Sequence, residues 1–189
     1  MVVDTVKVKG SAVKSIHEFI LKEYSEEIWK KIIALLDKES EQMFKGSILA
    51  TQWYPVSNYV KLLEIADREL SQGNGYFIEK SGRYSADYGM NTFYKVFFKV
   101  GSVFFILDRA ASVWEKYYSH GRMLVVERTE KSALLELKEF PYESETFCKR
   151  ITAYMGRLLE LTGVKKPEFK HISCVNNNNP SCTWRATWE

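Results

Sequence analysis

The sequence predicts an α+β fold in which an N-terminal helical bundle is followed by a β-β-α-β-β antiparallel sheet that is backed by helices. Up to about residue 121, apolar residues recur at helical spacing, and beyond it apolar and polar residues alternate. The 189 residues, 46% hydrophobic and 27% charged, suffice for one substantial core. We therefore expect one domain over 1–189, mainly helical over 1–121 and mixed over 122–189.

Five helices are expected in the first part of the chain. They are predicted over residues 13–24, 25–36, 55–72, 76–99 and 102–120. Ser25 precedes two glutamates, and Pro55 precedes an apolar stripe, which are both common helix starts. The last of these helices ends at Gly121, which can adopt the left-handed conformation of a helix cap.

The last third of the chain is expected to contain strands. Alternating residues predict them over 123–128, 132–138, 169–172 and 182–188. A helix from about Glu145 to Leu161 lies between the two pairs, because apolar residues return there at a spacing of three and four. The basic pair Lys149 and Arg150 is expected on a solvated face of that helix.

All three cysteines fall in this last part, in the pattern C-x22-H-x2-C-x7-C. Cys148, His171, Cys174 and Cys182 together form a ligand set of the kind that holds tetrahedral zinc. The alternative is that the cysteines are small buried hydrophobic residues and that the histidine has an ordinary partner. Because residues three apart on a strand face opposite sides, His171 can share a metal with Cys174 only if the strand bends near Ser173.

Composition excludes several classes of protein. The chain does not open with an apolar signal sequence and has no run of about eighteen uncharged apolar residues, so we expect a cytoplasmic protein without a membrane span. A net charge of +3 without a basic block argues against nucleic-acid binding. No phosphate-binding loop, dinucleotide fingerprint or nucleophile elbow is present, so we do not expect an enzyme.

Several short segments resemble a known group of proteins. They are Trp53-Tyr54-Pro55, the helix start at Gly101-Ser102, the segment from Tyr117 to Arg122, and the cysteine and histidine pattern. They resemble uncharacterised bacterial proteins, abundant in myxobacteria, that are related to the 4-vinyl reductase domain. The wider superfamily is similar in fold to haem-dependent nitric-oxide sensors, to phenol-sensing domains of transcription activators and to TRAPP tethering subunits.

The resemblance implies a structural metal site and a ligand pocket. In the phenol-sensing domains, zinc is held by three cysteines and a glutamate, and His171 takes the place of that carboxylate here. By analogy with the same domains, the ligand-binding candidates are Phe93, Phe97, Phe104, Trp114 and Phe169. The alternative for each of these rings is that it belongs to the core, since large aromatic residues dominate protein cores.

Haem is not expected as the cofactor. The segment from Tyr142 to Thr146 resembles the Tyr-x-Ser-x-Arg motif that binds propionates in the nitric-oxide sensors, but Thr146 stands where that motif has arginine. A threonine cannot supply the fixed charge and the forked donors of a guanidinium. His120 is expected to be an ordinary histidine near a helix end.

Two functions are compatible with these features. The first is a cytosolic sensor domain that binds an apolar or aromatic small molecule, contains structural zinc and signals through a protein partner. The second is a dimeric scaffold of the TRAPP type, a homodimer whose pocket does not exchange ligand freely. The resemblance favours the sensor.

Overall fold

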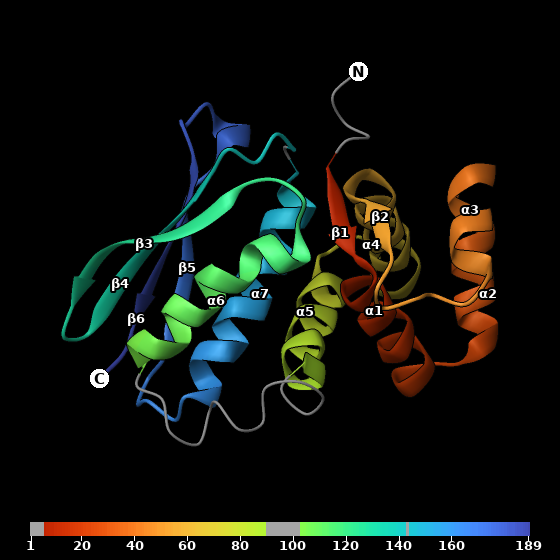
Figure 1. The fold of residues 1–189 in the computed structure, drawn as a ribbon. Helices are drawn as coiled ribbons and strands as arrows, with labels where there is room; N and C mark the ends of the chain where they lie inside the picture. The colour runs from red at the N-terminus through yellow and green to blue at the C-terminus, as the bar shows by residue number, and fades with distance from the viewer. Residues whose placement is uncertain (1–5, 90–102, 143) are drawn as a thin grey trace.

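The computed structural model of the chain describes residues 6–89, 103–142 and 144–189 and divides them into a helical part and a sheet part (Figure 1). The helical part comes first along the chain. Its elements are β1 (Lys7–Lys9), α1 (Gly10–Glu23), α2 (Glu26–Ala34), α3 (Lys38–Lys45), β2 (Trp53–Pro55), α4 (Val56–Ser71) and α5 (Tyr76–Gly89). β1 and β2 pair antiparallel, which holds the start of the chain against the segment that leads into α4.

The sheet part comes second. Its elements are α6 (Val103–Tyr117), β3 (Arg122–Thr129), β4 (Ser132–Lys138), α7 (Glu145–Leu161), β5 (Glu168–Ser173), the 3-10 turn η4 (Val175–Asn177) and β6 (Cys182–Thr187). The four strands lie in the order β3-β4-β6-β5, and each pair of neighbours is antiparallel. The predicted mixture of helices with antiparallel sheet is confirmed.

Side-chain caps explain where several helices begin. The Ser25 hydroxyl accepts a hydrogen bond from the Ile28 backbone N–H at the start of α2, and Asp37 accepts one from Ser40 at the start of α3. Ser144 does the same for Phe147 at the start of α7. Each cap satisfies a backbone donor that has no partner inside the helix.

A tight turn connects α4 and α5. Gly73 and Gly75 both have positive φ, +71° and +86°, which side chains disfavour. The buried carboxylate of Asp67 accepts hydrogen bonds from the backbone N–H groups of Gly75 and Phe77, at 2.9 and 3.1 Å. This turn therefore fixes the direction in which α5 runs toward α7.

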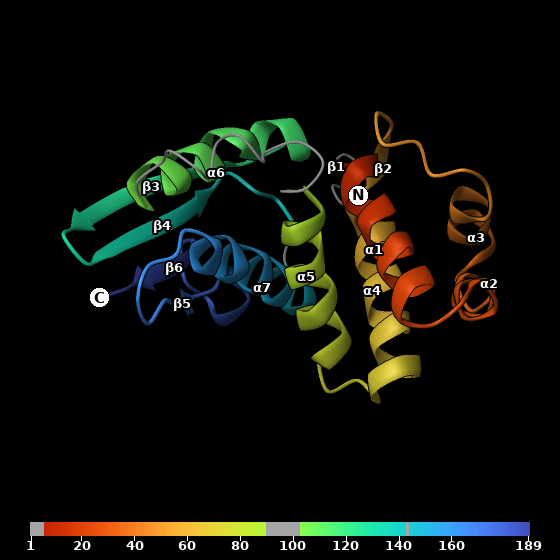
Figure 2. The same ribbon diagram turned by 90° about the horizontal axis from the view of Figure 1, so that it is seen from below.

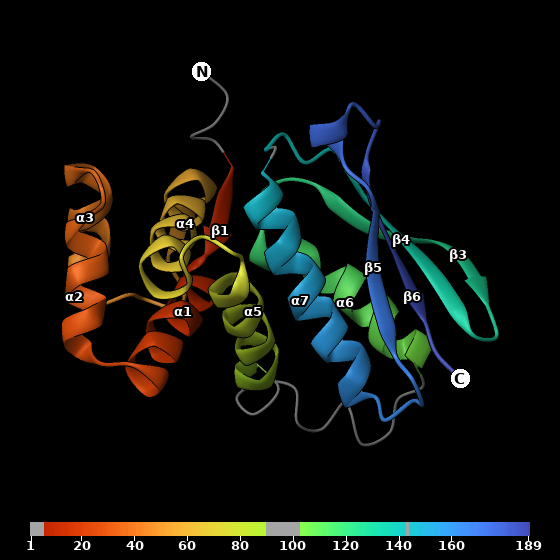
Figure 3. The ribbon, with the colours of Figure 1, turned by 180° about the vertical axis from the view of Figure 1, so that it is seen from behind.

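One face of the sheet is buried and is covered by two helices. Residues opposite one another on β4 and β6 are buried together, as Leu135 with Trp184 and Leu137 with Cys182. α6 packs along β3, and α7 packs along β5 and β6 (Figures 2 and 3). Alternation in β4 and β6 thus places their apolar side chains beneath α7.

α5 joins the helical part to the sheet part by packing closely on α7 (Figure 3). Gly82 of α5 makes this possible, because a Cβ there would lie 2.8 Å from the Cβ of Ala153 and 3.1 Å from the backbone oxygen of Arg150. Only a glycine allows the helices to approach this closely without displacement.

The structure adds elements that the sequence did not predict. α3 and the two-stranded β1–β2 sheet are new, since a three-residue strand carries too few residues for a detectable alternation. Pro55 ends β2, so α4 begins at Val56. The helix expected over 76–99 is present as α5 up to Gly89, and its remainder lies outside the described residues. No helix among the described residues is both long and apolar enough to cross a bilayer.

Candidate functional site

A cavity of about 120 Å³ lies among α1, α5, α6 and α7. α1 contributes small side chains, including Ser11, Ala12 and Ser15, and α5 contributes Ser85. Apolar side chains of the other two helices complete the wall. They are Ile106, Val113 and Trp114 of α6 and Ile151, Met155 and Leu158 of α7. α1 and α5 thus contribute hydroxyl groups to the cavity, whereas α6 and α7 contribute both apolar and polar side chains.

Arg150 is the buried charged side chain of the cavity lining. It is 3% exposed, although the sequence predicted it on a solvated face. Its guanidinium donates hydrogen bonds to the hydroxyls of Tyr59 (3.0 Å), Ser81 (2.9 Å) and Ser85 (2.5 Å). Ser85 in turn lies 2.5 Å from the hydroxyl of Ser15. This hydroxyl network connects α1, α4, α5 and α7 around one buried cation.

The charge of Arg150 is not neutralised by any carboxylate among the described residues. Its three hydrogen-bond acceptors are all neutral hydroxyls. No acidic side chain lines the cavity within the described part of the chain, whereas the exposed Arg109 lines it too. A buried charge without a counter-ion costs several kcal/mol of stability.

Aromatic rings close one end of the cavity. Trp114 stacks on Tyr118 with ring centroids 4.3 Å apart, and its indole N–H donates to the backbone oxygen of His120. Burial raises the pKa of Tyr118 well above its usual value, so its hydroxyl stays protonated. Tyr118 therefore presents a neutral phenol to the cavity.

The five aromatic residues predicted to bind ligand lie in different places. Trp114 lines the cavity, but Phe104 packs against Trp188 and Phe169 lines a separate surface depression beside α7. Phe93 and Phe97 lie outside the described residues.

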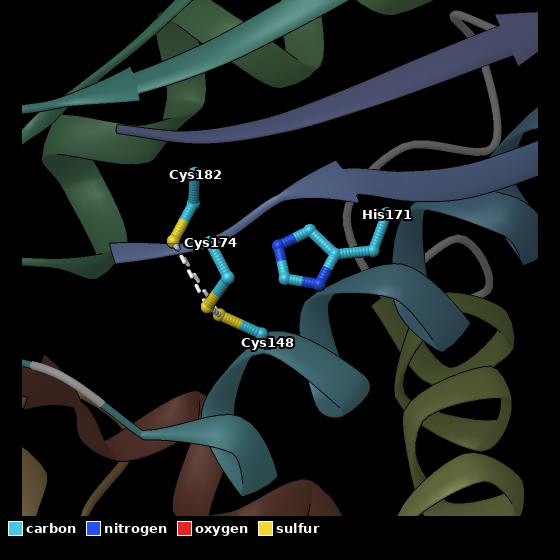
Figure 4. A group of neighbouring side chains, drawn as sticks. All are labelled: Cys148, His171, Cys174 and Cys182. Carbon is cyan, nitrogen blue, oxygen red and sulfur yellow. Dashed lines mark hydrogen bonds between the residues drawn. The ribbon is translucent and has the colours of Figure 1, made fainter. Parts of the chain in front are cut away.

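The predicted metal ligands converge beneath α7. The ligand atoms of Cys148, His171, Cys174 and Cys182 all lie within 4.8 Å of one another. The three sulfurs are 3.7 to 3.8 Å apart in every pair, and the cysteines are free thiols (Figure 4). Sulfurs bound at about 2.3 Å to one tetrahedral ion have about this separation.

A bulge brings the histidine to the same side as the cysteines. The register of β5 against β6 shifts between His171 and Ser173, so Ile172 is left over and points to solvent. One extra residue in a strand reverses the side to which the later side chains point. The bend that the sequence required near Ser173 is therefore present.

The imidazole of His171 is held in place by a tryptophan. Its ring stacks on Trp184 at 4.8 Å, and Trp184 is fixed by a hydrogen bond to Thr152. The Nε2 atom of His171 is buried and has no hydrogen-bond partner among the described residues, and the ring is turned toward the sulfurs (Figure 4). A buried nitrogen without a partner is unusual and fits a metal donor.

The cysteine contacts favour one thiolate. A hydrogen bond from the Cys148 thiol lowers the pKa of Cys182 to about 4, with a smaller contribution from His171. The same contact, together with burial, raises the pKa of Cys148. This contact favours the thiolate at Cys182, and the thiolate is the form of cysteine that binds metals.

Comparison with known proteins identifies the family. Residues 9–119, which are 111 of 189 and more than half of the chain, match the model of the family described as haem-NO-binding. The chain belongs to the haem-NO-binding family. A comparison with curated protein sequences finds no match.

Solved structures of H-NOX proteins share the fold. An NMR structure of an H-NOX domain from Shewanella oneidensis, in the Fe(II)CO state, has a TM-score of 0.72 at 10% identity and covers 96% of this chain and 98% of that chain. The crystal structure of an unliganded Fe(II) H-NOX protein from K. algicida has a TM-score of 0.69 at 13% identity, with 96% of each chain covered. The wider superfamily predicted from the sequence is confirmed by the match to the haem-NO-binding family. The narrower likeness to the 4-vinyl reductase domain stays a prediction.

The cofactor prediction is wrong. The sequence favoured structural zinc over haem. The family, however, is described as haem-NO-binding, and the similar solved structures include H-NOX proteins in Fe(II) states. The missing arginine at Thr146 was given too much weight, because one substitution in a motif does not remove a chain from its family.

The side chains of this member of the haem-NO-binding family do not form a histidine-ligated haem site. The sequence has three histidines: His17 packs on Trp29, His120 is exposed beside Ser119, and His171 belongs to the cysteine cluster. None of them lines the cavity. The potential iron donors that line it within the described residues are tyrosines, such as Tyr118, and Met155.

Sequence reasoning missed Arg150 and its hydroxyl partners. One signal was present: Arg150 lies three residues after Phe147 and four before Tyr154, which places it on the apolar stripe of α7 and not opposite to it. Its neighbour Lys149, which is exposed, made the pair look like a solvated face.

Proposed function

We propose that this chain is a small-molecule sensor domain of the haem-NO-binding family whose ligand occupies the cavity lined by Arg150 and Trp114, and that it signals through a protein partner without catalysing a reaction. The single observation that carries the proposal is the cavity itself. Its wall is built from both parts of the fold, α1 and α5 on one side and α6 and α7 on the other. A ligand there contacts both parts at once, so its binding can change how they pack.

The size of the cavity limits what fits without rearrangement. At about 120 Å³ it is near the roughly 150 Å³ of an engineered cavity that binds benzene, and below the roughly 300–1,000 Å³ of sites for drug-sized ligands. A molecule of one ring fits these dimensions. Haem, the ligand named for the family, would require the helices to separate and a tyrosine or methionine to ligate the iron.

Benzene and haemin test the proposal separately. Benzene should raise the melting temperature of the protein, because a ligand that binds only the folded state stabilises it by about 2.7 kcal/mol at a hundredfold excess over its dissociation constant. Haemin binding would appear as a shifted Soret absorption band with 1:1 stoichiometry.

The matched variants are Val113→Phe and Ser112→Phe. Val113 lines the cavity, whereas its neighbour Ser112 is exposed. Val113→Phe should abolish binding of either probe, and Ser112→Phe should leave it unchanged. If none of benzene, haemin and a charged one-ring molecule such as benzoate binds the native protein, the sensor proposal fails and the scaffold alternative gains support.

We propose in addition that Cys148, His171, Cys174 and Cys182 bind one tetrahedral metal ion that joins α7 to the sheet. The equal sulfur separations and the unpartnered Nε2 of His171 support this. With four protein ligands, such an ion would have no open position for a substrate.

Cobalt(II) is the direct probe of this second proposal. The native protein should bind one Co²⁺ with an intense thiolate-to-metal absorption band, which tetrahedral thiolate coordination produces. Cys182→Ser should weaken binding by more than the roughly 10–100-fold that is typical for loss of an outer-shell partner. Binding without a thiolate band, or unchanged affinity in Cys182→Ser, would contradict the proposal.

A further inference from the structure

The part of the cavity around Arg150 is built for a negative charge. Arg150 is almost fully buried, and its acceptors among the described residues are neutral hydroxyls. Its guanidinium carries more N–H groups than the three that these hydroxyls use, and Arg150 lines the cavity. The described wall contains no carboxylate that could neutralise it.

The hydroxyl partners hold the guanidinium without competing for its charge. Tyr59, Ser81 and Ser85 come from α4 and α5, and the short contact of Ser85 with Ser15 ties the network to α1. The planar fork of an arginine held in this way is arranged to bind a carboxylate with two parallel hydrogen bonds. Tyr118 lines the same cavity and can donate a further hydrogen bond.

The apolar part of the cavity lining selects the rest of the ligand. Ile106, Val113, Ile151 and Leu158 are apolar, and Trp114 offers an aromatic ring. An apolar body the size of one ring fills the remaining volume, and burying it contributes about 25 cal/mol for each Å² removed from water.

We propose that the ligand of this cavity is a small carboxylate with an apolar body of about one ring, whose carboxylate is bound by Arg150. This inference rests on the sensor function proposed above and names the chemical class of its ligand. The bound anion neutralises the buried guanidinium, so the same contact gives affinity for the carboxylate and discriminates against neutral molecules of equal shape.

Benzoate and benzamide are the probes, because they have nearly the same shape and differ in charge. Dissociation constants are measured by calorimetry on the native chain, on Arg150→Met and on Arg150→Lys. Benzoate should bind the native protein at least tenfold more tightly than benzamide, in line with the strength of hydrogen bonds to charged groups. Arg150→Met should lose this preference while still binding benzamide, and Arg150→Lys should keep part of it.

The outcomes separate this inference from the sensor function. If benzene binds but benzoate is no tighter than benzamide, the cavity is a ligand site and the carboxylate proposal is wrong. If benzoate binds equally well to the native protein and to Arg150→Met, Arg150 is a structural residue only and the proposal is again wrong. If no probe binds, both proposals fail. The comparison of benzoate with benzamide on the native chain needs no variant. It therefore tests the carboxylate proposal even if Arg150→Met does not fold.

Discussion

The two candidate sites of this protein lie on opposite sides of one helix and are built in opposite ways. Cys148 and Arg150 are two residues apart on α7, so their side chains point to different sides. Cys148 faces the sheet, where its partners are soft ligands in mutual contact. Arg150 faces α4 and α5, where its partners are neutral hydroxyls around a cavity.

This difference indicates which side of α7 is rigid and which side can change its packing when a ligand binds. On the side of α7 toward the sheet, Trp184 is fully buried, stacks on His171 and donates a hydrogen bond to Thr152. The side toward α1, α5 and α6 keeps a cavity and the charge of Arg150, for which the described residues provide no carboxylate partner. Ligand binding should therefore alter the helix packing around Arg150 and leave the sheet side unchanged.

The largest effect should come from removing the ring that supports the sheet side. Trp184→Ala should lower the free energy of unfolding by roughly 3–5 kcal/mol, because it deletes a fully buried ring and its hydrogen bond. Denaturant unfolding monitored by circular dichroism measures it. Trp53→Ala is the control: Trp53 is 37% exposed, so we expect a much smaller loss. Equal losses of unfolding free energy in the two variants would contradict the view that the sheet side of α7 is the rigid side.

The sequence predicted the cysteine and histidine cluster on the sheet side of α7 better than the hydroxyl groups around Arg150 on the other side. Cysteine and histidine are uncommon residues with a specific chemistry, so four of them identify a candidate cluster even across three elements. The bulge after His171 was required by that hypothesis and is present. By contrast, hydroxyls such as those of Tyr59, Ser81 and Ser85 are frequent everywhere, and nothing in their spacing indicates that they meet at one arginine.

The fold class could be predicted from periodicity, but the details that create the cavity could not. A change from helical spacing to alternation near Gly121 is visible in the sequence, and Gly121 does have positive φ. The close approach of α5 to α7 depends on the single residue Gly82, whose role depends on a neighbour that is about seventy residues away and therefore has no local signal.

Replacing two helical glycines by alanine should change the free energy of unfolding in opposite directions. Gly82→Ala places a methyl group 3.1 Å from the backbone oxygen of Arg150, which cannot move freely, so we expect a loss of about 1–3 kcal/mol and weaker benzoate binding. In Gly156→Ala the nearest atom, the Cβ of Phe169, lies at 3.5 Å, an ordinary contact. That change should stabilise α7 by up to about 1 kcal/mol. Chemical denaturation of both variants checks the prediction, and destabilisation of similar size in both would show that the contact between α5 and α7 is not tight.

The smallest expected effect concerns the ion pairs that hold α5 and α7 together at the surface. Glu160 accepts two hydrogen bonds from Arg83, at 2.8 and 2.7 Å, and one from Arg157. The hydrogen bonds from Arg83, more than those from Arg157, hold the pKa of Glu160 below its usual value of 4.5. Because the folded pKa is the lower one, the stabilisation is present above pH 4.5 and is lost as the pH falls through the folded value.

Glu160→Gln should therefore lower the free energy of unfolding by about 0.5–1 kcal/mol at pH 7, a small amount because the side chains are partly exposed to solvent. The difference from the native protein should shrink as the pH falls below 4.5, where Glu160 becomes protonated in the native protein too. Free energies of unfolding measured along a pH series test this. Glu168→Gln is the control, since Glu168 is exposed and, among the described residues, forms an ion pair only with Lys170, and should change stability less. A constant difference between Glu160→Gln and the native protein at every pH would show that the charge of Glu160 does not connect the two helices.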